Sequence, residues 1–155
     1  MVKSVRQKLI SVIGAGSPDD QARKWAQEVG RLVAGRGFGV VCGGLGGVME
    51  AACQGCAEAG GLTVGILPGT EASQANPWVR VAIPTGMGQA RNVMVVMAGC
   101  GAIAVAGGPG TLSEIAHAMK MGRPVVGLGT WAVPGLAEAD GPEEAVALLF
   151  DRLRC

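Results

Sequence analysis

A glycine-rich turn with an acidic residue behind it is the part of this chain best suited to chemistry. The segment Gly107-Gly108-Pro109-Gly110-Thr111-Leu112-Ser113-Glu114 joins an apolar run, residues 102–106, to a helical pattern. Glycines let backbone N–H groups approach a ligand closely, and the first turn of a helix adds unpaired donors and the positive end of the helix dipole. We therefore expect an anion to bind at this turn, with Glu114 facing the group that carries the anion.

Two further glycine-rich turns follow predicted strands, Gly14-Ala15-Gly16 and Gly43-Gly44-Leu45-Gly46-Gly47. Glycine at a single junction can equally serve only the backbone geometry of the turn. Two turns in corresponding positions, residues 43–47 and 107–110, favour a shared phosphate site. The first turn lacks the third glycine and the later acidic residue of a dinucleotide-binding fingerprint, and no Gly-Lys-Ser/Thr sequence marks a P-loop. Nicotinamide, flavin and P-loop nucleotide sites are therefore not expected.

Three charged or titratable side chains accompany these turns. Arg91 lies near the start of a predicted helix, where a cation opposes the helix dipole unless an anion is nearby, so we expect it to meet the ligand. Glu114 has a structural alternative, because residues 111–114 fit a capping box. Glu114 and His117 have a spacing that suits metal ligation on a helix, but no further ligands accompany them, so no metal is expected.

Apolar runs alternate with helical patterns along the whole chain, which predicts a doubly wound, Rossmann-like α/β domain with a parallel sheet covered on both faces. Ligands of such sheets bind outside the carboxyl ends of the strands, where the glycine-rich turns should gather. Ser17 and Pro18 are expected to start the first helix, and residues 68–77 to form a loop. The predicted strands are residues 9–13, 40–42, 62–67, 79–83, 102–106 and 125–128, and the predicted helices are residues 18–36, 48–59, 89–98, 111–121 and 145–153.

The composition suits one domain, spanning residues 1–155, that associates with itself. Charged residues make up 16% of the chain, against roughly 25% in an average soluble protein, while 49% of the residues are hydrophobic. Apolar surface should exceed what one small domain can hide, so we expect a homo-oligomer, a dimer or tetramer. A net charge of +1 and 3% aromatic residues supply neither the basic stripe nor the stacking surface of a nucleic-acid-binding protein.

Targeting and membrane signals are weak. The charged start, residues 1–8, is followed by an apolar stretch too short for a signal peptide, so a cytoplasmic location is expected. The uncharged stretch of residues 92–113 is interrupted by glycines and a proline and is not expected to span a membrane.

The cysteines are odd in number and mostly lie in apolar segments, which favours reduced, buried thiols for Cys42, Cys53, Cys56, Cys100 and Cys155. Cys53 and Cys56 have the spacing of a redox or zinc motif. A second ligand pair is absent and the motif falls within a helical pattern, so core packing is the favoured interpretation.

Four segments together resemble one superfamily, which contains the LONELY GUY phosphoribohydrolases and the molybdenum cofactor carrier proteins. They are Gly43-Gly44-Leu45-Gly46-Gly47-Val48-Met49-Glu50, Ile83-Pro84-Thr85-Gly86-Met87, Ala90-Arg91-Asn92 and the Gly107 to Glu114 segment. In the phosphoribohydrolases an Arg and a Glu cleave the N-glycosidic bond of nucleotide monophosphates, and Arg91 and Glu114 match those positions. Ala106 and Asn92 stand where that branch has Pro and Lys. The Ile83-Pro84-Thr85-Gly86-Met87 and Ala90-Arg91-Asn92 elements look more like the carrier branch, which binds an anionic pterin and needs no bond cleavage.

The resemblance implies a protein that binds a phosphorylated pterin or a nucleotide-like ligand, with bound molybdenum cofactor or a nucleotide monophosphate as candidates and no cofactor required for activity. The alternatives are a nucleoside monophosphate phosphoribohydrolase, with Arg91 and Glu114 as its catalytic residues, and a structural oligomer with a vestigial site. A pyridoxal phosphate decarboxylase is excluded because no lysine lies in a glycine-rich turn. The expected ligand-binding residues are Gly14, Gly16, Gly43, Gly44, Gly46, Gly47, Thr85, Gly86, Met87, Arg91, Asn92, Gly107, Gly108, Gly110, Thr111 and Glu114.

Overall fold

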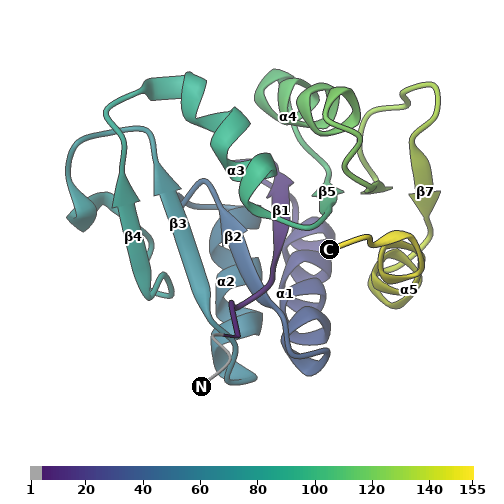
Figure 1. The fold of residues 1–155 in the computed structure, drawn as a ribbon, viewed down its shortest axis with the longest axis horizontal. Coiled ribbons are helices and arrows are strands. Elements are labelled where there is room, and N and C mark those ends of the chain that lie inside the picture. Colours follow the sequence, from purple (N-terminus) through teal and green to yellow (C-terminus); the bar gives the residue numbers. More distant parts are fainter. Residues whose placement is uncertain (1–4) are drawn as a thin grey trace.

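A seven-stranded, fully parallel sheet forms the centre of the computed structural model, which describes residues 5–155. The strands lie in the order β4-β3-β2-β1-β5-β6-β7 (Figure 1). This confirms the Rossmann-like α/β fold. The strands are β1 (Leu9–Gly14), β2 (Gly39–Cys42), β3 (Thr63–Leu67), β4 (Val81–Pro84), β5 (Ala102–Val105), β6 (Val125–Leu128) and β7 (Ala137–Ala139).

Helices cover both faces of the sheet (Figure 1). One face packs against α1 (Asp20–Gly35), α2 (Val48–Glu58) and α5 (Pro142–Arg152). The other face packs against α3 (Asn92–Ala98) and α4 (Pro109–Lys120). Two short 3₁₀ helices complete the chain, η1 (Ala72–Gln74) inside the predicted loop and η2 (Gly88–Arg91) just before α3.

The central strands are apolar on both sides because each side meets a helical layer. In β1, Ile10 and Val12 pack into the layer of α1, α2 and α5, while Ile13 packs into the layer of α3 and α4. In β5, Ile103 and Ala104 divide between the two layers in the same way. Side chains of a strand alternate between the two faces, so a strand covered on both sides reads as a continuous apolar run.

Three local details differ from what the sequence suggested. Asp19, not Ser17, is the N-cap of α1, which begins at Asp20. The Asp19 carboxylate accepts a hydrogen bond from the backbone N–H of Ala22 at 2.8 Å. Helix α4 begins at Pro109 with Gly108 as its N-cap, so residues 111–114 do not form a capping box. The short edge strand β7 was missed, since its three residues carry no recognisable strand pattern.

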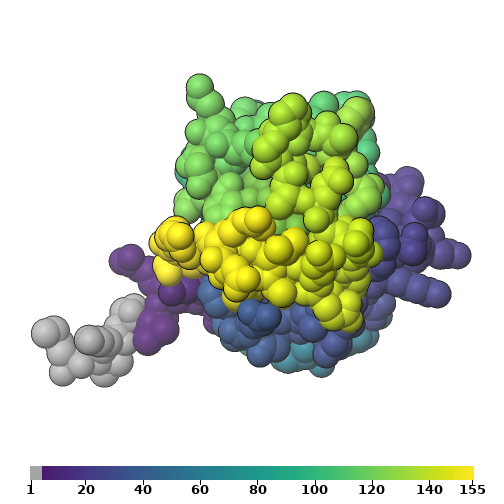
Figure 2. Space-filling view, turned by 90° about the vertical axis from the view of Figure 1, so that its right-hand side faces the viewer, coloured from purple at the N-terminus to yellow at the C-terminus, as the bar shows by residue number. Residues whose placement is uncertain are grey.

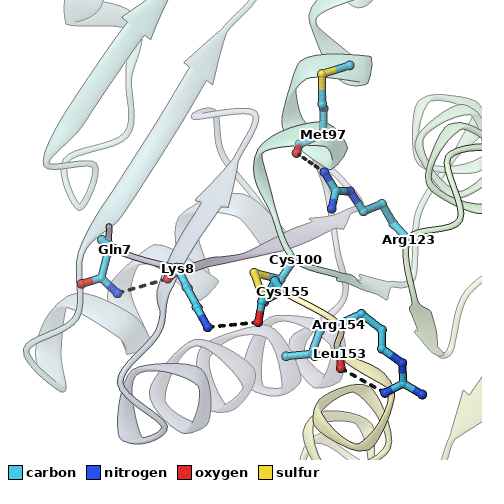
Figure 3. The surroundings of a disulfide bond; sticks show 8 residues. All are labelled: Gln7, Lys8, Met97, Cys100, Arg123, Leu153, Arg154 and Cys155. Atoms are coloured by element: carbon cyan, nitrogen blue, oxygen red, sulfur yellow. Dashed lines mark hydrogen bonds between the residues drawn. A yellow bond between two sulfur atoms is a disulfide. The ribbon is translucent and has the colours of Figure 1, made fainter. Parts of the chain in front are cut away.

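The cysteines divide into two groups. Cys42, Cys53 and Cys56 are buried and free, as expected, and burial raises the pKa of the Cys56 thiol to about 11. Cys100 and Cys155 instead form a disulfide, so the expectation of reduced thiols was wrong for this pair (Figure 3). The tail that carries Cys155 also accepts a hydrogen bond from Lys8 Nζ, at 3.0 Å from the Cys155 carbonyl oxygen. The pair lies far apart in sequence, which is why spacing could not reveal it.

Helix α5 and the segments that flank it form one side of the molecule, shown in yellow and yellow-green in Figure 2. Within residues 5–155, no helix has the length and apolar character needed to cross a membrane. Residues 1–4, part of the charged start that was weighed as a targeting signal, lie outside the described residues.

The disulfide should make a large contribution to stability, because it joins cysteines 55 positions apart and restricts the unfolded chain. The chain-entropy relation gives about 4 kcal/mol for a loop of this length. We expect dithiothreitol to lower the guanidinium midpoint of the wild-type protein. The double variant Cys100→Ser/Cys155→Ser should unfold, with or without dithiothreitol, at the midpoint that the wild-type protein shows in dithiothreitol. A wild-type midpoint that does not change on addition of dithiothreitol would contradict the prediction.

Candidate functional site

A cavity of about 250 Å³ opens at the carboxyl ends of β1, β2 and β5. The chain leaves β1 for α1 on one face of the sheet and leaves neighbouring β5 for α4 on the other. Such a reversal parts the loops and creates the crevice in which doubly wound folds bind ligands. The structure brings these predicted site residues to the cavity: Gly14, Gly16, Gly43, Arg91, Asn92, Gly108, Gly110, Thr111 and Glu114.

The N-terminus of α4 supplies backbone donors to this cavity. Pro109 at the first helical position has no N–H, and the first intrahelical bond runs from Leu112 N–H to the Gly108 carbonyl at 3.1 Å. The N–H groups of Gly110 and Thr111 therefore have no partner inside the helix. The turn before them needs glycine, because Gly107 adopts φ +117° and its missing Cβ would sit 2.4 Å from Thr111 Oγ1. The N-terminus of α4 on the cavity wall can therefore bind an anion.

Arg91 is the cation of the site, and it is only 5% exposed. Its Nε donates to the Ile66 carbonyl at 2.9 Å, and its Nη2 donates to the Gly43 carbonyl at 3.4 Å. Burial lowers the pKa of Arg91 from its usual value, although nearby Glu114 opposes that shift. The guanidinium is thus fixed to the ends of β2 and β3, and its remaining N–H groups are available to a ligand in the cavity.

Asn92 positions Arg91 and joins it to α4. Its Oδ1 accepts a hydrogen bond from Arg91 Nη1. Its Nδ2 donates to Gln89 Oε1 at 3.3 Å and to Ser113 Oγ at 3.5 Å. All of these contacts are within the protein, so Asn92 holds the site together. Its own contact with a ligand stays a prediction.

Glu114 presents a carboxyl group to the cavity from the second turn of α4. The side chain is 9% exposed, and no described residue donates a hydrogen bond to its carboxylate. Burial raises the pKa of Glu114 to about 7, and the positive charge of Arg91 acts in the opposite direction. A mostly buried residue whose carboxyl group borders a cavity and has no donor among the described residues is the arrangement expected of a group that contacts a ligand.

The remaining predicted residues do not line the cavity, and their binding roles stay predictions. Thr85 donates to the Leu67 carbonyl at 2.7 Å and accepts from Met87 N–H at 3.1 Å, which fixes a turn at the exposed end of β4. The first N–H of α2, from Val48, is taken by the Ala15 carbonyl at 2.9 Å. The others outside the cavity lining are Gly44, Gly46, Gly47, Gly86 and Gly107.

Several lining residues were missed by the sequence analysis. Gln89 belongs to the Arg91 network, and its polar side chain just before Ala90-Arg91-Asn92 was a signal that could have found it. Apolar lining residues carry no such signal, because their types are those of any core: Val12, Ile13, Ala15, Leu45, Met49 and Pro109. Within residues 5–155, no three His, Cys, Asp or Glu side chains cluster in a way that could hold a metal ion.

Comparison with known families decides where the chain belongs. Residues 7–150 match the model of the SLOG cluster4 family. The chain belongs to this family. A protein of uncharacterised function from Archaeoglobus fulgidus is 45% identical over 138 residues, which cover 88% of this chain and 91% of that relative.

Solved structures relate this SLOG protein to molybdenum cofactor carriers, which confirms that part of the resemblance. The molybdenum cofactor binding protein of Rippkaea orientalis is 35% identical, with a TM-score of 0.89 over 96% of this chain and 98% of that one. The molybdenum cofactor carrier protein of Chlamydomonas reinhardtii is 32% identical, with a TM-score of 0.84 over 94% and 98%. DNA processing protein A of Streptococcus pneumoniae, at 17% identity and a TM-score of 0.76 over 96% and 62%, shares the fold alone.

Filling the helix end should remove anion binding without unfolding the protein. A Cβ at Gly110 would meet nothing closer than 3.9 Å, so Gly110→Val places its side chain in the cavity without a clash. We expect the affinity for inorganic phosphate, measured by calorimetry, to fall about tenfold or more, because charged hydrogen bonds are lost. Gly35→Val, at an exposed site with no neighbour within 4 Å, is the matched control. Unchanged phosphate binding in Gly110→Val would show that the glycine serves only the turn.

Glu114 should make stability depend on pH. Below pH 4.5 the carboxyl is protonated in both the folded and the unfolded chain, and as the pH rises through about 7 the folded protein must bury a charge. Stability should therefore fall over this range, by up to about 3 kcal/mol. Glu114→Gln should remove this fall in urea unfolding, whereas exposed Glu138→Gln should keep the wild-type profile. Parallel profiles of stability against pH for wild type and Glu114→Gln would contradict the prediction.

Proposed function

We propose that this protein binds a phosphorylated pterin of the molybdenum cofactor type and carries it without cleaving it. The observation that carries the proposal is the cavity itself, because the residues that bear the free N–H groups of α4 and the Arg91 guanidinium line the same space. The similarity to the Rippkaea orientalis and Chlamydomonas reinhardtii proteins along nearly the whole chain supports the same ligand class.

The donor set fits the phosphate of such a ligand. The N–H groups of Gly110 and Thr111, with the remaining donors of Arg91, would hold the phosphate oxygens, and the helix dipole favours their negative charge. Glu114 would then face the part of the ligand next to the phosphate.

Identification of the bound molecule tests this proposal directly. We expect the purified protein, after denaturation, to release a phosphorylated pterin detectable by mass spectrometry, or to bind one added in vitro. Release of a nucleoside monophosphate instead would count against the carrier function.

Hydrolysis of nucleoside monophosphates is the second candidate function, favoured by the presence of Arg91 and Glu114 in the lining of the same cavity. In that reaction Arg91 would hold the 5′-phosphate, and the Glu114 carboxylate would stabilise the oxocarbenium-like transition state. A carrier needs only ground-state binding, whereas a hydrolase must bind the transition state more tightly than the substrate.

Glu114→Gln separates the two functions, because it keeps the shape of the side chain and removes its charge. For a carrier, we expect no release of free adenine from AMP by the wild-type protein, and an affinity for phosphorylated pterin within a few-fold in the variant. A hydrolase would release adenine, and the variant would lose turnover by about a hundredfold or more. Adenine release that Glu114→Gln abolishes, followed by chromatography, would replace the first proposal with the second.

Self-association is the remaining part of the proposal. Apolar side chains are exposed along the β4 edge and the turn that follows it, with Val81 43%, Ile83 41% and Met87 53% accessible. We expect light scattering at micromolar concentration to give the mass of two or four chains. Ile83→Lys should lower that mass, and Val5→Lys, at a position 90% exposed and far from this edge in sequence, should not. A monomeric wild type would refute the prediction.

A further inference from the structure

An exposed tryptophan is hydrogen-bonded to a residue that lines the cavity. Trp131 belongs to the segment between β6 and β7, which appears as yellow-green atoms on the surface above α5 (Figure 2). Its indole Nε1 donates to the carbonyl of Gly108 at 3.0 Å. Gly108 is the N-cap of α4 and lines the cavity. The indole is therefore hydrogen-bonded to the residue at the helix N-terminus where we expect an anion to bind.

Hydrogen bonds to the turn that precedes α4 fix the position of this indole. Ala106 adopts φ +51°, and it is the one non-glycine residue with positive φ in residues 5–155. Its N–H donates to the Leu128 carbonyl at 3.1 Å, and its carbonyl accepts from Thr130 Oγ1. A left-handed alanine costs free energy and persists only where its surroundings impose it. The segment with Thr130 and Trp131 is therefore held against the turn by hydrogen bonds at both Ala106 and Gly108.

Trp131 differs from the other tryptophans in its surroundings. Trp25 and Trp78 are partly buried and pack against the core layer of α1, α2 and α5. Trp131 is 39% exposed. Aromatic residues make up only 3% of the chain, so an exposed indole fixed beside the cavity is unusual in this protein. Covering its apolar face would be favourable.

The size of the cavity gives the reason for a group outside it. Its volume, about 250 Å³, lies below the roughly 300–1,000 Å³ of sites that enclose small organic ligands. A phosphate with one attached group fills such a space. A planar heterocycle joined to a phosphate at the N-terminus of α4 would extend beyond this space, toward the surface that carries Trp131.

We propose that Trp131 is a ligand-binding residue, whose indole packs against the planar ring of a phosphorylated heterocycle anchored at the N-terminus of α4. This inference rests on the proposed function, and it adds the ligand class that Trp131 selects: a phosphate joined to a flat, nitrogen-containing ring. Stacking on an aromatic side chain tolerates many rings, because each presents a π face. Selectivity for a ring over a simple phosphate ester then comes from Trp131, and phosphate affinity comes from α4 and Arg91.

The test compares three probes: the phosphorylated, oxidised pterin obtained from molybdenum cofactor, AMP, and glycerol 3-phosphate, which has no ring. We expect Trp131→Ala to weaken binding of the phosphorylated pterin at least about fivefold in calorimetry, because aromatic stacking is lost. Glycerol 3-phosphate should bind within about twofold of wild type, since it has no ring to stack on Trp131. Trp131→Phe should retain most of the pterin affinity, and Trp78→Phe is the matched control.

Tryptophan fluorescence supplies a second readout. The pterin should quench the wild-type and Trp78→Phe proteins, and most of this quenching should disappear in Trp131→Phe. If wild type binds the pterin and Trp131→Ala binds it equally well, or loses glycerol 3-phosphate to the same extent, the stacking role is wrong and the carrier function stands. If Trp131→Ala weakens the binding of AMP and wild type does not bind the pterin, stacking is supported and the carrier function is overturned. If neither ring compound binds wild type, both proposals fall.

Discussion

The close parallel pairing of β1 with β5 is the constraint on which the site depends. Their register places Gly14 beside Val105, and a Cβ at Gly14 would lie 2.2 Å from the Val105 carbonyl oxygen. Only a residue without a side chain lets the two strands end together at this point. Because the chain then turns to opposite faces of the sheet, the loops part and leave the cavity open between them. The helix end of α4 and the network around Arg91 both border that opening.

Charge balance within the cavity follows from the same geometry. Arg91 and Glu114 are both removed from water, and each moderates the effect of burial on the other. Arg91 is compensated by carbonyl oxygens at the ends of β2 and β3, whereas Glu114 has no such support from the described residues. The site therefore holds a fixed positive end and a carboxyl whose protonation responds to what enters. Such an environment favours an anion that brings hydrogen-bond donors with it.

Membership of the SLOG cluster4 family and similarity to molybdenum cofactor carriers agree with this reading of the cavity. The arginine and glutamate that would perform hydrolysis also suffice to bind a phosphorylated ligand, so residue identity alone does not separate carrying from cleaving. The disulfide adds a separate feature at the opposite end of β5, where Cys100 ties the tail of α5 to the sheet. Disulfides are characteristic of oxidising compartments and of some hyperthermophiles, so the cytoplasmic location stays a prediction.

The sequence by itself determined the parallel α/β architecture, because buried strands and glycine-to-helix junctions are local patterns with fixed periods. It also placed Arg91, Glu114 and the Gly107–Gly110 turn among the candidates for the site. Only the tertiary structure decided which glycines reach the cavity, that Asn92 holds Arg91, and that Cys100 meets Cys155. These outcomes depend on contacts between residues far apart in the chain. Spacing along one segment carries no information about which distant segment will fold against it.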